Sequence, residues 1–222
     1  MKQPVPFTCA ECKQLSCRKE GHPNMPANCP MRTNPEIVEE ARSEYLTEEN
    51  NRFFIQSAYL ESDAFGRFPR LKETILFCKR MGYKHIGLAF CSAFAEEATI
   101  VSSLMRQAGL TVESVRCKCG GIRKDTMGIE REHWVHPELE FEPICNPITQ
   151  AKMLDSRGVE FNVVMGLCVG HDSLFLKYTK TMSTVLLVKD RVCGHNPIAA
   201  VYLYKHNYWG SMISEDEDKH EG

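Results

Sequence analysis

The spacing of apolar residues changes character at Gly82. From Pro35 to this glycine, apolar residues recur at intervals of three and four, as on one face of a helix; Ile37, Val38, Ala41 and Tyr45 form one such face. Helices are predicted over residues 35–45, 51–64 and 69–81. Asn34 and Pro35 suit the N-cap and the first turn of the first of these helices.

After Gly82, short apolar runs alternate with helical patterns. Strands are predicted over residues 85–90, 110–116, 159–165 and 183–188, and helices over residues 93–108, 147–155 and 171–178. Residues 117–141 have little periodicity and are expected to form a long functional loop. Strands that alternate with helices favour an α/β fold, with a mostly parallel, Rossmann-like sheet flanked by helices.

Three regions are expected along the chain. Residues 1–33 are rich in proline and cysteine and hold too few apolar residues for a core, so they are expected to form a small metal-stapled knuckle. Residues 34–213 are expected to form the α/β domain. Residues 214–222 (SEDEDKHEG) are acidic, and we expect them to be disordered.

Composition and charge exclude several classes of protein. The 222 residues are 43% hydrophobic and 25% charged, as in ordinary globular proteins. A formal net charge of -2 gives no basic excess for nucleic-acid binding. Because no apolar run approaches the roughly 20 residues of a membrane span and no secretory signal is seen, a cytoplasmic protein with reduced thiols is expected.

The 11 cysteines are the main chemical signal, because numerous reduced thiols point first to metal binding. Cys9, Cys12, Cys17 and Cys29 form a C-x2-C-x4-C-x11-C pattern. Four thiolates complete a tetrahedral zinc shell, and metal binding would supply folding energy of order 10 kcal/mol to this segment. Zinc is favoured as the metal. An iron–sulfur cluster is the alternative, because Cys29 is followed by proline, as is the last cysteine of many iron–sulfur motifs. His22 could replace one of the cysteines as a ligand.

A second group of cysteines follows the predicted strands. Cys91, Cys117 and Cys168 each come directly after one, and Cys145 would join them if its loop folds back. The carboxyl ends of parallel strands share one edge, where ligands bind. The leading hypothesis is therefore a metal or iron–sulfur site for redox or metal-dependent chemistry on a small molecule. Buried structural thiols are the plain alternative, and Cys78, on a helix face, is expected to be one.

The segment GLCVGHD supports a different chemistry. Cys168 stands between two glycines in the spacing of a nucleophile elbow, and a helix beginning near it would favour the thiolate. A thiol enzyme would use Cys168 as nucleophile, His171 or His195 as base and Asp190 to orient the base. A third hypothesis is a non-enzymatic metal or redox sensor whose metal holds a surface for a redox partner.

Several blocks together carry a resemblance: GLAFC (87–91), CNPITQA (145–151), GLCVGHD (166–172) and KDRVCGHNP (189–197), behind the amino-terminal C-x2-C-x4-C. They resemble a domain family of unknown function, described as uncharacterised metal-binding proteins of archaea and anaerobic bacteria. The resemblance implies metal-ligand roles for Cys9, Cys12, Cys17, Cys29, Cys91, Cys117, Cys145 and Cys168. The resemblance assigns no role to Cys119 or Cys193, so their roles stay open, and it implies no substrate, reaction or oligomeric state.

Overall fold

The computed structural model describes residues 5–204, and the chain divides into two compact units, Met1–Asp63 and Ala64–Gly222. The division falls after Asp63, so the first long helices group with the cysteine-rich segment, whereas the sequence placed a boundary after residue 33. The acidic stretch 214–222 lies outside the described residues. No helix within residues 5–204 is long and apolar enough to cross a bilayer.

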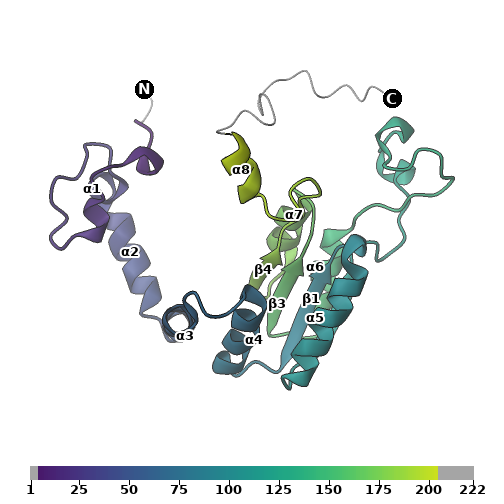
Figure 1. Ribbon diagram of the computed structural model, residues 1–222, viewed down its shortest axis with the longest axis horizontal. Coiled ribbons are helices and arrows are strands. Elements are labelled where there is room, and N and C mark those ends of the chain that lie inside the picture. Colours follow the sequence, from purple (N-terminus) through teal and green to yellow (C-terminus); the bar gives the residue numbers. More distant parts are fainter. Residues whose placement is uncertain (1–4, 205–222) are drawn as a thin grey trace. The chain divides into compact units, whose positions relative to one another are not determined.

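The amino-terminal unit is a looped segment followed by helices (Figure 1). The loop contains two short 3-10 turns, Cys9–Glu11 and Ser16–Arg18, and the helices are α1 (Pro30–Thr33), α2 (Pro35–Tyr45) and α3 (Glu48–Ala64). Among residues 5–63, only Ser16 is buried. This unit therefore has almost no core of its own.

The apolar face predicted for the first helix exists, but it is not buried. Ile37, Val38 and Tyr45 of α2 are 56%, 49% and 52% exposed. Tyr45 contacts the Phe54 ring of α3, with ring centroids 4.9 Å apart, and Phe54 is itself half exposed. Periodicity correctly predicted the helix, and its apolar face stays exposed because no layer of this unit covers it.

The second unit contains a four-stranded, all-parallel sheet in the order β2-β1-β3-β4, which confirms the α/β prediction. Its strands are β1 (His85–Phe90), β2 (Thr111–Arg116), β3 (Phe161–Met165) and β4 (Ser183–Leu187). Every residue of β3 is buried, as expected for a central strand covered on both faces.

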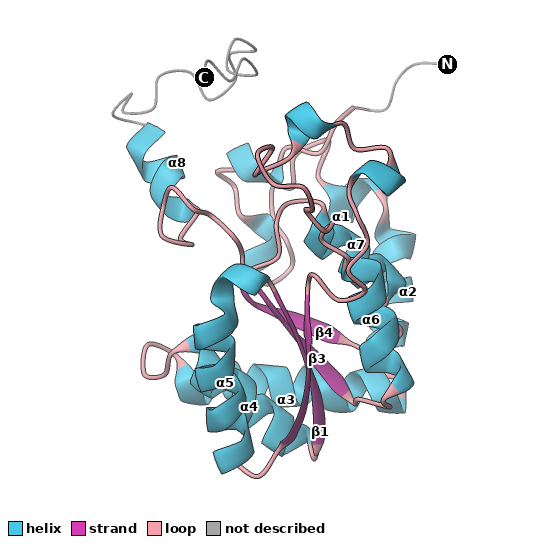
Figure 2. Cartoon of the chain, turned by 90° about the vertical axis from the view of Figure 1, so that its right-hand side faces the viewer, coloured by secondary structure: helices cyan, strands magenta, loops and turns pink. Residues whose placement is uncertain are grey.

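Helices cover both faces of the sheet (Figure 2). They are α4 (Arg70–Met81), α5 (Ala95–Gln107), α6 (Pro147–Ser156) and α7 (His171–Tyr178), and α8 (Ile198–Tyr204) follows β4. The pair α6 and α7 pack together on one face, and α4 and α5 lie on the other. Cys78 of α4 is fully buried, and burial raises the pKa of its thiol to about 12, so its predicted core role is confirmed.

The strand order changes direction beside β1. From β1 the chain moves to β2 on one side, and later returns to β3 on the other side. In open parallel sheets, ligands bind in the crevice outside the carboxyl ends of the strands at such a switch point. The ends of β1 and β3 are therefore where this fold favours a site.

Candidate functional site

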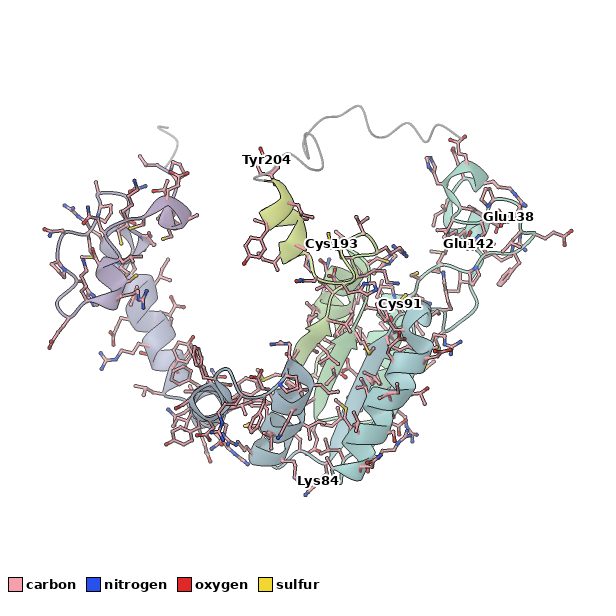
Figure 3. The ribbon with its side chains drawn as sticks, in the orientation of Figure 1. Lys84, Cys91, Glu138, Glu142, Cys193 and Tyr204 are labelled. Atoms are coloured by element: carbon pink, nitrogen blue, oxygen red, sulfur yellow. The ribbon has the colours of Figure 1, made fainter. Side chains whose placement is uncertain are left out.

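Two cysteines extend the sheet ladder at its carboxyl edge. The Cys91 N–H donates to the Met165 carbonyl at 3.1 Å, and the Cys117 N–H donates to the Phe90 carbonyl at 2.9 Å. Figure 3 shows Cys91 at this edge, with Lys84, which precedes β1, at the opposite end. The positions of both thiols are therefore set by the strands themselves.

The loop that contains Cys145 does fold back over this edge. The Asn146 N–H donates to the Cys117 carbonyl at 2.7 Å, and Asn146 Nδ2 donates to the Cys119 carbonyl at 3.2 Å. Asn146 Oδ1 accepts from the Thr149 N–H, so the same residue caps α6. These bonds place Cys145 next to Cys117, although the two lie far apart in the chain.

The turn after β3 brings Cys168 to the same place. Gly166 and Gly170 have φ of 65° and 83°, a left-handed region that glycine adopts readily. The N–H groups of His171 and Asp172 donate to the Cys168 carbonyl at 3.0 and 3.2 Å, at the start of α7. Cys168 and His171 thus occupy one tight strand-to-helix turn.

All four predicted thiols line one small pocket. Cys91 and Cys117 are buried, and Cys145 and Cys168 are half-buried. The pocket is lined by Cys91, Cys117, Cys145, Pro147, Gln150, Leu167, Cys168 and His171. The structure therefore brings together the thiols that the sequence placed at the strand ends and His171, the candidate base, and it adds the amide of Gln150.

The thiols are coupled to one another and to two lysines. A hydrogen bond with Cys117, together with burial, raises the pKa of Cys91 to about 12, although Lys189 Nζ lies 2.5 Å from its sulfur. A hydrogen bond from Cys117 and the nearby Lys118 ammonium lower the pKa of Cys145 to about 6. In the metal-free site, Cys145 therefore becomes a thiolate at a much lower pH than Cys91.

His171 is neutral at physiological pH. Burial, reinforced by the charge of Lys118, lowers the pKa of the His171 imidazole. A neutral imidazole is the form that binds a metal or accepts a proton. His171 therefore fits either role in this pocket.

Gln150 contributes an unpaired acceptor to the pocket. Its side chain is fully buried, and Nε2 donates to the carbonyls of Phe90 (3.1 Å) and Val115 (2.7 Å). These two bonds fix the orientation of the amide, and Oε1 has no hydrogen-bond partner among the described residues. A buried acceptor without a hydrogen bond lowers stability by about 1–3 kcal/mol, so a bound group that donates to Oε1 would recover this energy.

A larger cavity of about 950 Å³ adjoins this pocket and shares Cys91, Cys145, Cys168 and His171 with it. Residues 122–146 form much of its wall. A buried ion pair between Lys124 Nζ and Glu142 Oε1, 2.6 Å apart, fastens this segment together with an antiparallel bridge between Arg123 and Pro143. The long loop predicted at 117–141 is therefore an ordered wall of the site.

Asp190 and His195 are engaged in their own loop. The Asp190 N–H donates to His195 Nδ1 at 3.1 Å, and Asp190 Oδ1 accepts from the N–H groups of Val192 and Cys193. The His195 ring makes a T-shaped contact with the Phe94 ring, with centroids 4.5 Å apart. Neither Asp190 nor His195 lines the thiol pocket or the larger cavity, so the structure does not place them beside Cys168.

The four amino-terminal cysteines lie in the loops of the first unit. Cys9 and Cys17 are exposed and Cys12 and Cys29 partly exposed, and all are free thiols. His22 Nδ1 lies 3.2 Å from the Ser16 carbonyl, a contact that metal-bound and ordinary loop histidines both make, so the role of His22 as an alternative ligand stays a prediction.

Neither of the two sets of four cysteines has its sulfurs at the distances of a tetrahedral metal site. Within residues 5–204, three or more possible ligand atoms lie within 4.8 Å of one another only at the exposed Glu130, Glu132 and His133. A tetrahedral zinc site holds its sulfurs roughly 3.8 Å apart, given a Zn–S distance of about 2.3 Å. A single ion would therefore require the thiol side chains of either group to rotate inward.

Sequence reasoning missed Lys118, Asn146 and Gln150. Lys118 was visible between Cys117 and Cys119, and the other two were visible in the CNPITQA block. Their roles depend on contacts between distant segments, such as Gln150 Nε2 with Phe90, and no local pattern predicts such contacts.

Comparison with known proteins gives a family but no activity. A family model described as a protein of unknown function (DUF1847) matches residues 29–186. An uncharacterised protein of Methanocaldococcus jannaschii is 41% identical over 167 residues, which cover 75% of this chain and 84% of that protein. The matched range includes Cys29 and the four pocket thiols, whereas Cys9, Cys12 and Cys17 precede it.

Proposed function

Because the chain belongs to the DUF1847 family of proteins of unknown function, its activity must be argued from its site, and we propose that it is a metal-binding protein whose working centre is the thiol pocket. The observation that carries this proposal is the convergence of four cysteines and His171 on one pocket at the switch point of the sheet. Thiolate and imidazole ligands select soft or borderline metals such as zinc, or an iron–sulfur cluster.

The surroundings of the thiols fit this proposal. Several thiolates in one pocket would repel one another, and Lys118 and Lys189 supply compensating positive charge. The unpaired Oε1 of Gln150 is an acceptor for a ligand or for water held by a metal. The adjoining cavity would admit a small molecule to the centre, which suits redox or metal-dependent chemistry.

A second, structural metal is proposed for the amino-terminal unit. Cys9, Cys12, Cys17 and Cys29 are its ligands, with zinc the favoured ion. The support is physical: a unit that buries only Ser16 among residues 5–63 needs another source of folding energy, and structural zinc supplies it.

The test is a count of iron, zinc and acid-labile sulfide per chain after anaerobic purification, together with the absorbance spectrum. We expect one metal at the amino-terminal unit and a second metal or a cluster at the pocket. The double variant Cys91→Ser/Cys117→Ser should lose only the second, Cys9→Ser/Cys12→Ser only the first, and Cys193→Ser neither. A colourless protein with at most one zinc, insensitive to Cys91→Ser/Cys117→Ser, would refute the proposed centre.

One observation favours a thiol enzyme as a second candidate function. Cys168 is half-buried in the cavity, and His171, whose imidazole is neutral, shares its turn. In that function His171 is the base, since His195 lines neither cavity. Iodoacetamide would then modify Cys168 faster than every other thiol; protection of Cys168 in the purified protein would exclude this function.

A further inference from the structure

The cavity beside the thiol pocket has an excess of positive charge. Four lysine and arginine side chains line it: Lys118, Lys124, Lys189 and Arg191. Among the described residues that line it, Glu142 alone has a carboxylate, and that group is paired with Lys124. If the charges of Lys118 and Lys189 neutralise neighbouring thiolates, the positive charge of Arg191 remains to bind an anionic ligand.

Much of the rest of the cavity wall is apolar. Its aliphatic and aromatic residues come largely from the segment 122–144: Ile122, Met127, Ile129, Val135, Leu139, Phe141 and Ile144. Val135 is 71% exposed and Met127 58%, so these side chains present apolar surface to water. Covering that surface would stabilise a ligand by about 25 cal/mol per Å².

Two of the four basic residues, Lys189 and Arg191, come from a different part of the chain than the apolar wall. Lys189 and Arg191 follow β4 at the sheet edge, near Cys91, while the apolar residues belong to the excursion between β2 and α6. The Lys124–Glu142 ion pair and the bond from the Ile144 N–H to the Ile122 carbonyl (2.8 Å) hold the apolar wall in shape. A ligand that satisfies both parts must have an anionic end and an apolar body.

We propose that this cavity binds a small amphipathic anion, with its carboxylate or phosphate beside Arg191 and Lys189 and its apolar body along the wall of residues 122–144. An arginine guanidinium matches the oxygens of either anion. A volume of about 950 Å³ is ample for such a molecule. The inference rests on the proposed function in one respect: the ligand is the small molecule presented to the thiol-bound centre.

Binding is tested with octanoate on the full chain carrying 13C-methyl methionine. Met127 lines the cavity and reports occupancy, Met105 is fully buried in α5 and serves as the internal reference, and a Met127→Leu variant assigns the signal. We expect octanoate to shift the Met127 resonance saturably and leave Met105 unchanged. Octan-1-ol and octylamine have the same chain length without the negative charge, and octyl phosphate tests the other anion.

Charge recognition predicts a ranking. Octan-1-ol and octylamine should bind at least about tenfold more weakly than octanoate, and Arg191→Gln should weaken octanoate by about tenfold. Arg191→Lys should retain part of the affinity, and Lys177→Gln, an exposed lysine of α7 that does not line the cavity, should retain all of it. Tighter binding of octyl phosphate than of octanoate supports the proposal and identifies the anion as a phosphate.

Two results would overturn the inference. Equal affinity for octanoate, octan-1-ol and octylamine would show that charge plays no part, and a Met127 signal unmoved at millimolar octanoate would show that the cavity is not the site. Metal content is measured on the same sample. Anion binding without metal at the pocket therefore refutes only the metal centre, and metal without anion binding refutes only this inference.

Discussion

Lys189 Nζ lies 2.5 Å from Cys91 Sγ and so joins the loop after β4 to the end of β1. These strands are not neighbours, because β3 lies between them. The contact therefore places a positive charge across the switch point of the sheet, beside the deepest thiols.

Lys189→Met should weaken metal retention at the pocket. The substitution leaves the thiolate charge without one of its two nearby cations, and an opposite charge at this range is worth about one pKa unit or more. We expect at least about tenfold faster metal loss to a chelator. The measurement is metal per chain against time, with Lys177→Met as the surface control; identical rates would show that the Lys189 contact is incidental.

In metal-free protein, Cys145 should react with iodoacetamide with a midpoint near its pKa of about 6, while Cys91, whose pKa is about 12, should resist at pH 8. Lys118→Met should move the Cys145 midpoint upward, because that ammonium favours the thiolate. Peptide mass spectrometry across pH 5–9 gives both curves. Modification of Cys91 before Cys145 would contradict these hydrogen bonds and charges around the two thiols.

The Lys124–Glu142 ion pair should stabilise the cavity wall. Burial alone would raise the pKa of Glu142, but Lys124 and the His136 N–H bring it below its ordinary value. Its stabilisation is therefore present above the unfolded value near 4.5 and is lost as pH falls through the lower folded value. Glu142→Gln leaves the buried Lys124 ammonium without its partner and should lower the free energy of unfolding by roughly 3–5 kcal/mol. The double variant Lys124→Met/Glu142→Leu should lower it much less.

The measurements are hydrogen exchange of residues 122–144 and thermal unfolding, made on the wild-type protein, the single variant Glu142→Gln and the double variant Lys124→Met/Glu142→Leu. Above pH 6 the single variant should expose the wall and the double variant should not. If the single and double variants lose equal stability, the pair does not fasten the wall.

Gly166→Ala should be more damaging than Gly158→Ala. Both glycines have a left-handed backbone, with φ of 65° and 66°, so both substitutions meet the same backbone strain. A Cβ at position 158 meets no atom within 4 Å, whereas one at position 166 overlaps the buried Phe94 ring. We expect Gly166→Ala to cost roughly 1–3 kcal/mol more, measured by urea unfolding. Equal losses would mean that Phe94 moves aside freely.

Chelation should unfold the amino-terminal unit without unfolding the sheet of the second unit. With only Ser16 buried among residues 5–63, this unit has little besides the proposed metal to order it, whereas the second unit has its own core. Limited trypsin digestion after treatment with a zinc chelator should cut within residues 5–33 first. Resistance of that segment in chelated protein would contradict a metal-dependent fold.

Much of the fold could be predicted from the sequence. Alternating short apolar runs and helical patterns predicted the four strands to within two residues, because a parallel sheet buried on both faces requires such runs. The covering of α2 could not be predicted. Ile37 and Val38 show that the helix has an apolar face, but periodicity does not say whether another element lies over it.

The site was predictable where topology alone determines it. Cys91 and Cys117 follow neighbouring parallel strands, so their proximity followed from the predicted fold. Lys118 and Gln150 could not be assigned roles, because those roles depend on packing between α6 and the sheet. Asp190 and His195 have the residue types of a catalytic pair, but their hydrogen bonds close a local loop.

The Cys91 and Cys117 amides are bonded to the strand ladder itself, and Cys145 is tied to the same ladder through the Asn146 N–H. The backbone positions of these thiols are thus set by the sheet, while the wall of the larger cavity belongs to a separate excursion between β2 and α6. Substitutions in residues 122–144 would accordingly change which compound the cavity admits, while the backbone that holds these thiols stays in place.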